Sequence, residues 1–220
     1  MCGRYSFAVE DELIFERFGV SVRSAIYKAR YNCAPSQNLA VISTEDPAVL
    51  SFYRWGLIPF WAKDPSIGNK LINARAETII EKPSFKQAFR LRRCLVLSDG
   101  FFEWKKAKEK TPYRISLQDC TPFSMAGIWE NWKNPEGEVI RSFSIITTHA
   151  NSLIENIHDR MPVILQREDE KKWLDSSQEK ELLGLLQPYP SEQMKTYPIS
   201  KKVNSPLNDV PEVLEMVEIF

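Results

Sequence analysis

The 220-residue sequence predicts an α+β fold, with a single domain of curled, mainly antiparallel β-sheet that is barrel-like and carries short flanking helices. About ten short runs are rich in β-branched and aromatic residues, and most are bounded by Gly, Pro, Asn or Asp. Short helical stretches are interleaved with these runs. No linker, repeat or low-complexity tract interrupts the chain, so we expect one domain over residues 1–220.

The individual elements follow from hydrophobic periodicity and turn residues. Strands are expected at residues 4–9, 39–43, 49–55, 94–97, 101–105, 113–117, 123–129, 140–148, 162–165 and 194–199. Helices are expected at residues 11–18, 76–81, 85–91, 152–157 and in two stretches within 168–186. Pro83 and Ser84 mark the start of the third helix.

The formal net charge is zero, but the charges are unevenly distributed along the chain. Residues 51–115 contain 14 basic and 6 acidic side chains, whereas residues 116–220 contain 10 basic and 17 acidic ones. Binding of a polyanion depends on a local basic face rather than on the sum of charges. If the two stretches form separate faces, the basic one suits nucleic acid and the acidic one limits indiscriminate binding.

Four cysteines, Cys2, Cys33, Cys94 and Cys120, lie far apart with no C-x-x-C pair, which argues against a zinc site and a disulfide framework. We therefore expect reduced thiols, no metal and no cofactor. The N-terminus lacks a basic and an apolar region typical of a signal peptide, and no run reaches the roughly 18 apolar residues of a membrane span. A cytoplasmic protein without membrane contact is expected.

The first candidate for chemistry is Cys2. Cysteine is small enough at position 2 for Met1 to be removed, which leaves an α-amine and a thiol on adjacent carbons. An α-amine with a pKa of about 7.7 to 8.0 is partly unprotonated at neutral pH, and a neighbouring ammonium lowers the thiol pKa. The amine can form an imine with an aldehyde, and the thiolate can then close a thiazolidine ring. The alternative is an incidental residue in a frayed terminus, against which the strand expected at 4–9 argues.

Asn73 and Arg75 precede a helical stretch. An amide and a guanidinium there could hold a phosphate or order a catalytic terminus. The plainer alternative is an Asn helix cap followed by a solvated Arg.

Glu103 lies within Asp99–Lys105, where strand alternation puts Phe102 and Trp104 on one face and Glu103 on the other. A carboxylate among aromatic residues is partly desolvated, which raises its pKa and suits it to proton transfer. An edge-strand Glu paired with a Lys is the structural alternative.

His158 is one of only two histidines, so imidazole chemistry has few candidates. It stands at the end of an expected short helix, before a polar turn from which loop residues can reach a site. A helix C-terminus also favours a charged His through the helix dipole alone.

The middle of the chain interleaves aromatic and basic residues, in Phe52–Trp55 and Phe60–Lys63, followed by Lys86, Arg90, Arg92 and Arg93 on a short helix. Aromatic platforms beside a positive groove hold single-stranded nucleic acid without reading its bases. Lys105, Lys106, Lys108 and Lys110 are expected at a solvated hairpin tip with no role in a site.

Several motifs occur together: MCGR at residues 1–4, YNCAP at 31–35, WG at 55–56, NARAET at 73–78, DGFFEW at 99–104, TTHAN at 147–151 and HDRMP at 158–162. In this order they closely resemble the SOS-response-associated peptidase (SRAP) family, the abasic-site shielding proteins. The resemblance covers residues 2–165, and weaker likeness continues through residues 198–204, so we expect the C-terminal part to complete the domain to about residue 216.

The resemblance implies a single α+β domain that binds single-stranded DNA, crosslinks covalently to abasic sites through a thiazolidine, and removes its own Met1. Cys2 would be the nucleophile, Asn73 would position it, Glu103 would assist proton transfer and His158 would act on the sugar oxygen of the ring-opened site. Arg4, Asn32, Arg75 and Arg160 match positions near DNA phosphates, and Trp61 matches an aromatic wedge against bases. The expected protein is a monomer that associates with the nucleoid when bound to DNA.

Some positions depart from the family pattern. Cys33 replaces a more usual aliphatic residue, Phe60 stands where a second tryptophan can occur, and Leu97-Ser98 replaces Pro-Ala. Residues 64–69 resemble a variable loop. The departures do not affect the Cys2 chemistry, but they do not settle which aromatic residue forms the wedge or which DNA junction it prefers. They also make Cys33 a candidate second thiol near the site.

Two other functions share these residues. An N-terminal-nucleophile peptidase or amidohydrolase would use Cys2 against a diffusible substrate, with its own amine as base, and it leaves the basic aromatic stretch unexplained. A non-covalent reader of single-stranded or modified DNA would not need Cys2.

Overall fold

The computed structural model describes residues 2–21, 27–105 and 110–218. The strands are β1 (Tyr5–Phe7), β2 (Arg30–Cys33), β3 (Asn38–Ser43), β4 (Asp46–Trp55), β5 (Asn73–Arg75), β6 (Arg93–Ser98), β7 (Gly100–Trp104), β8 (Pro112–Leu117), β9 (Phe123–Lys133), β10 (Val139–His149), β11 (Arg160–Pro162) and β12 (Met194–Pro198). The helices are α1 (Asp11–Phe18), α2 (Lys86–Leu91), α3 (Arg167–Asp175) and α4 (Glu179–Gly184).

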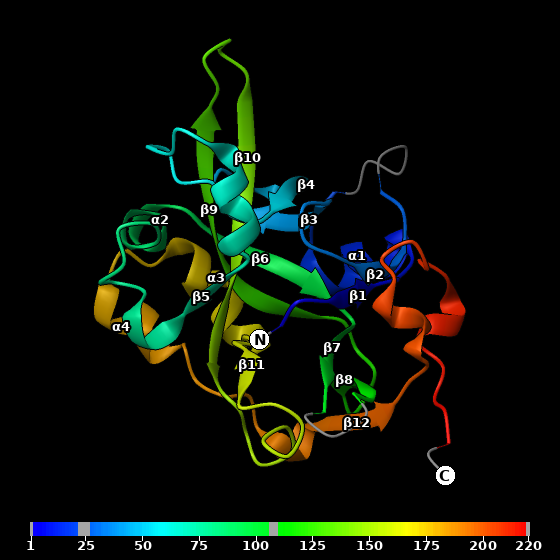
Figure 1. Cartoon of the computed structure of the whole chain (residues 1–220). Coiled ribbons are helices and arrows are strands. Elements are labelled where there is room, and N and C mark those ends of the chain that lie inside the picture. Colours follow the sequence, from blue (N-terminus) through cyan, green and yellow to red (C-terminus); the bar gives the residue numbers. More distant parts are fainter. Residues whose placement is uncertain (1, 22–26, 106–109, 219–220) are drawn as a thin grey trace.

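The strands form two sheets, and the larger one closes into a barrel (Figure 1). Its ring runs β10, β4, β3, β6, β9 and back to β10, because the long strand β9 pairs with both β6 and β10. Only the pairing of β4 with β10 is parallel within this ring of described strands. The predicted α+β fold with a curled, mainly antiparallel sheet is confirmed.

The ring closes tightly where β9 passes β6. A Cβ atom on Gly127 of β9 would lie 2.7 Å from the Sγ atom of Cys94 and 2.8 Å from a methyl carbon of Val96. Glycine is therefore needed here so that the two strands can approach at normal pairing distance.

The second sheet has the order β12, β8, β7, β1, β2, so the N-terminal strand β1 is interior rather than at an edge. Its residue Tyr5 pairs with Phe101 of β7 on one side and with Cys33 of β2 on the other. The Phe102 N–H donates to the carbonyl of Arg4 at 2.9 Å, which extends the pairing toward residue 2. The sheet thereby fixes the start of the chain.

Aromatic packing joins the two sheets. The ring of Tyr5 in β1 lies 5.2 Å from that of Trp55 in β4, and Trp55 is stacked on Phe143 of β10 at 6.3 Å. All three side chains are almost completely buried. Such ring pairs add specific geometry to the burial of apolar area, so the two sheets share one hydrophobic core.

The helices cover the outside of the sheets. Helix α1 buries Ile14 and ends at Gly19, whose positive φ of 69° lets its N–H donate to the Phe15 carbonyl at 2.8 Å. Helices α2 and α3 pack through Phe89 and Trp173, whose ring centres are 5.9 Å apart. In these regions the predicted helices are confirmed.

Several predicted elements were wrong or displaced. Residues 152–157 form turns rather than a helix, and the helix expected at 76–81 is only a 3₁₀ turn over Ala76–Thr78. Strand β11 lies at Arg160–Pro162, two residues before the expected 162–165. Strands β2 and β5 were not predicted, because they are short and carry polar side chains without a clear alternation.

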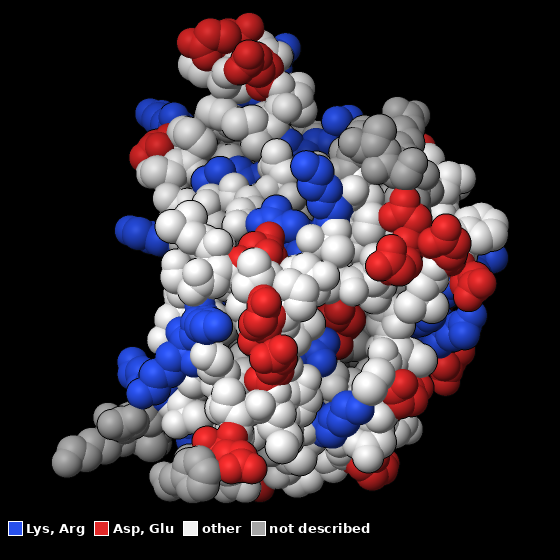
Figure 2. Space-filling view, turned by 90° about the vertical axis from the view of Figure 1, so that its right-hand side faces the viewer, with Lys and Arg blue, Asp and Glu red and all other residues white. Residues whose placement is uncertain are grey.

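Some charges of the middle block meet charges of the C-terminal third in ion pairs, so the two stretches do not lie wholly on separate faces. Arg90 pairs with Glu179 at 2.6 Å and Arg92 with Glu130 at 2.7 Å, so middle-block cations are neutralised by C-terminal anions. The guanidinium of Arg93 is buried and donates to backbone carbonyls at the end of α3, among them that of Trp173 at 2.6 Å. Figure 2, which views the side of α1 and the C-terminal segment, shows acidic and basic side chains interspersed.

Candidate functional site

Cys2 is fully buried, although it is the first residue that the structure describes. Its backbone carbonyl accepts a hydrogen bond from Nδ2 of Asn73 at 2.8 Å. Its Sγ atom lies 3.8 Å from the carbonyl oxygen of Arg4. The interpretation of Cys2 as part of a frayed terminus is therefore wrong.

Asn73 reaches Cys2 from β5, which pairs in parallel with β10 so that Asn73 lies opposite Ile145. Its Oδ1 atom is buried and has no hydrogen-bond partner among the described residues. The following 3₁₀ turn begins after Arg75 without a side-chain cap, so Asn73 is not a helix cap. The Nδ2 group of the amide instead donates to the Cys2 backbone, and its Oδ1 atom is able to accept a further hydrogen bond.

Glu103 lies on β7, which is an interior strand between β8 and β1, and it is 2% exposed. The alternative of an exposed edge-strand glutamate is therefore wrong. Burial raises the pKa of the Cys2 thiol well above its usual range, and the nearby carboxylate of Glu103 raises it further. The thiol is therefore held in its protonated form, and the Glu103 carboxylate is near enough to affect its pKa.

His158 lies in the turn before β11. Its Nδ1 atom accepts the backbone N–H of Arg160 at 3.0 Å, so the neutral ring carries its proton on Nε2. The carboxylate of Asp159 is 3.2 Å from the same Nδ1 and would pair with the protonated ring. The hydrogen bond from Arg160 fixes the ring in the turn next to β11, which pairs with β10.

Strand β10 gathers the remaining polar groups at its C-terminal end. Thr147 lies opposite Arg75 of β5 on one side and Pro162 of β11 on the other. Arg160 of β11 is buried, and its guanidinium donates to both carboxylate oxygens of Glu77 at 2.6 and 3.0 Å. The bidentate pair lowers the pKa of Glu77.

Glu77 was missed by sequence reasoning, although it lies within the NARAET motif. It also lies 3.2 Å from Nε2 of His149. The signal that could have found it is the presence of an acidic residue two positions after an arginine expected to bind phosphate. Arg75 itself is exposed and has no ion-pair partner among the residues described.

Arg4 and Asn32 are held by the protein itself. Nη1 of Arg4 donates to Oδ1 of Asn32 at 2.8 Å and to the carbonyl of Val203 at 2.6 Å. Asn32 is completely buried. The structure thus places these two residues together, and Arg4 is two positions along the chain from Cys2.

Trp61 and its neighbour Phe60 are 48% and 54% exposed. Their turn is fixed, because Nε1 of the buried Trp132 donates to the Ala62 carbonyl at 2.7 Å. Two aromatic rings on a fixed turn form a platform on which a base can stack. Exposure of the predicted wedge residue is compatible with that role.

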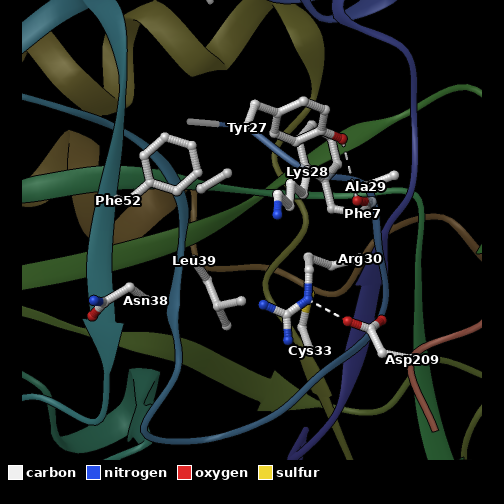
Figure 3. A pocket seen from close by; sticks show the side chains of 11 residues that line it. Phe7, Tyr27, Lys28, Ala29, Arg30, Cys33, Asn38, Leu39, Phe52 and Asp209 are labelled. Atoms are coloured by element: carbon white, nitrogen blue, oxygen red, sulfur yellow. Dashed lines mark hydrogen bonds and ion pairs between the residues drawn. The ribbon is translucent and has the colours of Figure 1, made fainter. Parts of the chain in front are cut away.

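A cavity of about 290 Å³ lies elsewhere, between β2 and the strands β3 and β4 (Figure 3). Phe52, Tyr27 and Leu39 contribute apolar surface, and Arg30 reaches into it while paired with Asp209. Cys33 lies at its base and is buried, with a pKa raised by burial. The candidate second thiol is therefore enclosed in this cavity wall.

Fold and motifs together define the class. The chain belongs to the SRAP family, since the family model described as SOS response associated peptidase (SRAP) matches residues 1–206. The Bacillus subtilis abasic site processing protein YoqW is 46% identical over 98% of this chain and 99% of its own length. The Xenopus tropicalis abasic site processing protein HMCES is 33% identical over 87% of this chain and 67% of its own.

A crystal structure of a protein from Bacteroides thetaiotaomicron has the same fold. It superposes with a TM-score of 0.91 at 35% identity and covers 99% of this chain and all of that one. No helix among the described residues is long and apolar enough to cross a membrane.

Proposed function

We propose that the protein binds single-stranded DNA and crosslinks covalently to abasic sites through Cys2, which shields the lesion. The observation that carries the proposal is the burial of Cys2 with its carbonyl held by Asn73 and with the Glu103 carboxylate beside it. The abasic site processing names of the relatives support the DNA lesion as the target.

Removal of Met1 by hydrolysis would expose the α-amine of Cys2. This amine adds to the C1′ aldehyde of a ring-opened abasic site, and loss of water gives an imine. The thiol then adds across the C=N bond, so that a C–S bond forms and the nitrogen regains a proton. The thiazolidine is closed with the net release of one water molecule.

Ring closure also explains why a 1,2-aminothiol is suited to this lesion. A lysine stops at the imine, which acidifies the neighbouring C2′ protons and favours β-elimination of the strand. Because the second addition removes the iminium, the adduct leaves the DNA uncut. An internal cysteine lacks the amine and cannot perform both steps.

Glu103 is proposed as the proton carrier. Since burial and the Glu103 carboxylate both raise the thiol pKa, little thiolate exists before the lesion binds. Transfer of the thiol proton to the carboxylate as sulfur attacks the imine avoids a free buried thiolate. The same carboxyl can first supply the proton for loss of water.

His158 and the arginines have separate proposed roles. The Nε2–H of a neutral His158 can donate to the sugar ring oxygen as the abasic site opens. Arg75 is exposed and suits a phosphate, whereas the guanidinium fork of Arg160 is already on Glu77. We therefore propose that Arg160 positions the Glu77 carboxylate. It would contact a DNA phosphate only through guanidinium N–H groups that do not donate to Glu77.

The test is the intact mass of the purified protein before and after incubation with single-stranded DNA that contains one abasic site. We expect mature protein without Met1, then an adduct equal to both masses less one water that survives denaturing electrophoresis. Cys2→Ser and a form that retains Met1 should give none. Efficient adduct formation by either variant would refute the proposal.

Removal of Met1 is proposed to be autocatalytic. Attack of the Cys2 thiol on the Met1 carbonyl would transfer the acyl group from nitrogen to sulfur, and water would then hydrolyse the thioester. In protein produced without a methionine aminopeptidase, the wild type should therefore lose Met1, whereas Glu103→Gln should retain it in part and Cys2→Ala should retain it fully. Multiple turnovers on unrelated peptides would instead support a general peptidase.

A further inference from the structure

The segment 203–209, called the C-terminal strap, lies across β2 near the start of the chain (Figure 1). The carboxylate of Asp209 accepts the backbone N–H groups of Tyr31 and Asn32 at 2.6 and 2.9 Å, and it also pairs with Arg30 (Figure 3). Asp209 lies beyond the residues that the family model matches. Through it, the strap replaces a neighbouring strand along the edge of β2.

Asn32 uses its whole side-chain amide within the protein. Its Nδ2 donates to the carbonyls of Val203, Ser205 and Asn208 at 3.2, 3.0 and 2.9 Å. Its Oδ1 accepts Nη1 of Arg4. Because the side chain is also 0% exposed, its donor groups are used inside the fold and cannot reach DNA.

Arg4 is held at one nitrogen only. Nη1 is shared between Asn32 and the Val203 carbonyl. Its Nε is buried without a partner among the described residues, and no hydrogen bond within the described part of the chain uses Nη2. Nη2 is therefore the guanidinium nitrogen that can donate to a phosphate oxygen.

We infer that Asn32 is a positioning residue: with the strap, it orients Arg4 so that Nη2 donates to a DNA phosphate near Cys2, and Asn32 itself does not contact DNA. The inference rests on the proposed function for the identity of the ligand. It changes the role that the family resemblance implies for Asn32.

The strap also reaches the strand of Glu103. Nε1 of Trp104 donates to Oδ1 of Asn204 at 2.8 Å, and the buried Val203 packs against Phe102. One segment thus holds both the arginine next to the nucleophile and the strand of the proton carrier. A phosphate placed by Arg4 is therefore placed relative to both.

The test is a double-mutant cycle on the dissociation constant for a single-stranded oligonucleotide without a lesion. Arg4→Gln should weaken binding about tenfold and reduce the salt slope by about 0.7, as expected for one lost phosphate contact. Asn32→Ala should weaken it less, and the double variant should bind no more weakly than Arg4→Gln. Effects that multiply would show that Asn32 contacts DNA itself or acts through general destabilisation, and would overturn the inference.

A second variant keeps the test decisive if Asn32→Ala does not fold. Asp209→Asn removes the charge that latches the strap, and it should weaken binding in the wild-type background but not in Arg4→Gln. Leu207→Ala is the matched control, because this strap side chain is 92% exposed. An equal loss for Asp209→Asn in both backgrounds would also overturn the inference.

The two proposals fail in different ways. If the wild-type protein forms the adduct but the effects of Arg4→Gln and Asn32→Ala on the dissociation constant multiply, only the positioning role of Asn32 is contradicted. If the protein binds single-stranded DNA and the two effects do not multiply, but no adduct forms, only the covalent function is contradicted. Absence of any binding to single-stranded DNA contradicts both.

Discussion

The site around Cys2 and the exposed segment 60–63 differ in how their chemical groups are held. Cys2 and Glu103 are buried, Asn73 of β5 holds the Cys2 carbonyl, and the C-terminal strap contacts the strand of Glu103 through Trp104. In the exposed segment, Trp61 and Lys63 project from the surface, and Lys63 has no ion-pair partner among the described residues. The contrast indicates that reactivity and affinity are encoded separately, the first in a fixed interior and the second on a solvated surface.

The largest expected effect lies in the buried site. In protein from which Met1 has been removed, Glu103→Gln should lower the rate of adduct formation at saturating DNA by at least about 100-fold, the usual contribution of a general acid or base. Binding of undamaged single-stranded DNA should be unchanged. Quench-flow or gel-based single-turnover kinetics measures the rate.

The same variant has an opposite effect on the thiol. Since the Glu103 carboxylate raises the Cys2 pKa, its removal lowers that pKa and increases the thiolate fraction at any pH below it. Cys2 should therefore be alkylated faster by iodoacetamide in Glu103→Gln at pH 8. Cys94 is an internal control, because burial alone raises its pKa. Slower or equal alkylation of Cys2 would contradict the assigned coupling.

A smaller effect on the adduct rate is expected from Asn73, the residue that positions Cys2. Asn73→Ala removes the hydrogen bond to the Cys2 carbonyl and should lower the adduct rate by about 10- to 100-fold, as expected for a misplaced nucleophile. Asn134→Ala, in the exposed β9–β10 turn, is the control and should react like wild type. A loss of DNA affinity with an unchanged rate would assign Asn73 to the binding surface instead.

Sequence reasoning was most successful where a local pattern decides the structure. Strand alternation correctly separated Phe102 and Trp104 from Glu103, and the periodicity of residues 11–18 predicted α1 with its exact bounds. Sequence reasoning failed for β2 and β5, whose three or four residues are held by long-range partners. Asn32, for example, is ordered by carbonyls more than 170 positions away.

The site shows the same limit. Cys2 and Asn73 were named from motifs, but their contact joins residues 71 positions apart and could not be derived from spacing. The charge pattern failed for a related reason. Middle-block arginines are long side chains that reach acidic partners or carbonyls from later elements, so counting charges along the chain did not predict the surface.

On the exposed segment, Trp61→Ala should weaken binding of single-stranded DNA by about tenfold, the usual value of one stacked base. The adduct rate at saturating DNA should not change, which separates this residue from those around Cys2. Phe15→Ala is a matched control, since this aromatic ring is 60% exposed on α1. Fluorescence anisotropy measures the affinity, and a fall in the saturated rate would place Trp61 in the reactive site.

The smallest expected effect concerns Lys63 and tests how exposed cations contribute to DNA affinity. Lys63→Gln should weaken binding only about two- to threefold at roughly physiological salt, because an exposed cation is largely screened there, and should reduce the salt slope by about 0.7. Arg90→Gln is the matched control: its charge is also exposed, but it already pairs with Glu179, so DNA gains little from it. If both variants reduce the salt slope equally, an ion pair such as that of Arg90 with Glu179 does not decide which cations bind DNA phosphates. If only Lys63→Gln reduces it, the neutral chain binds a polyanion through the cations that the fold leaves without a partner.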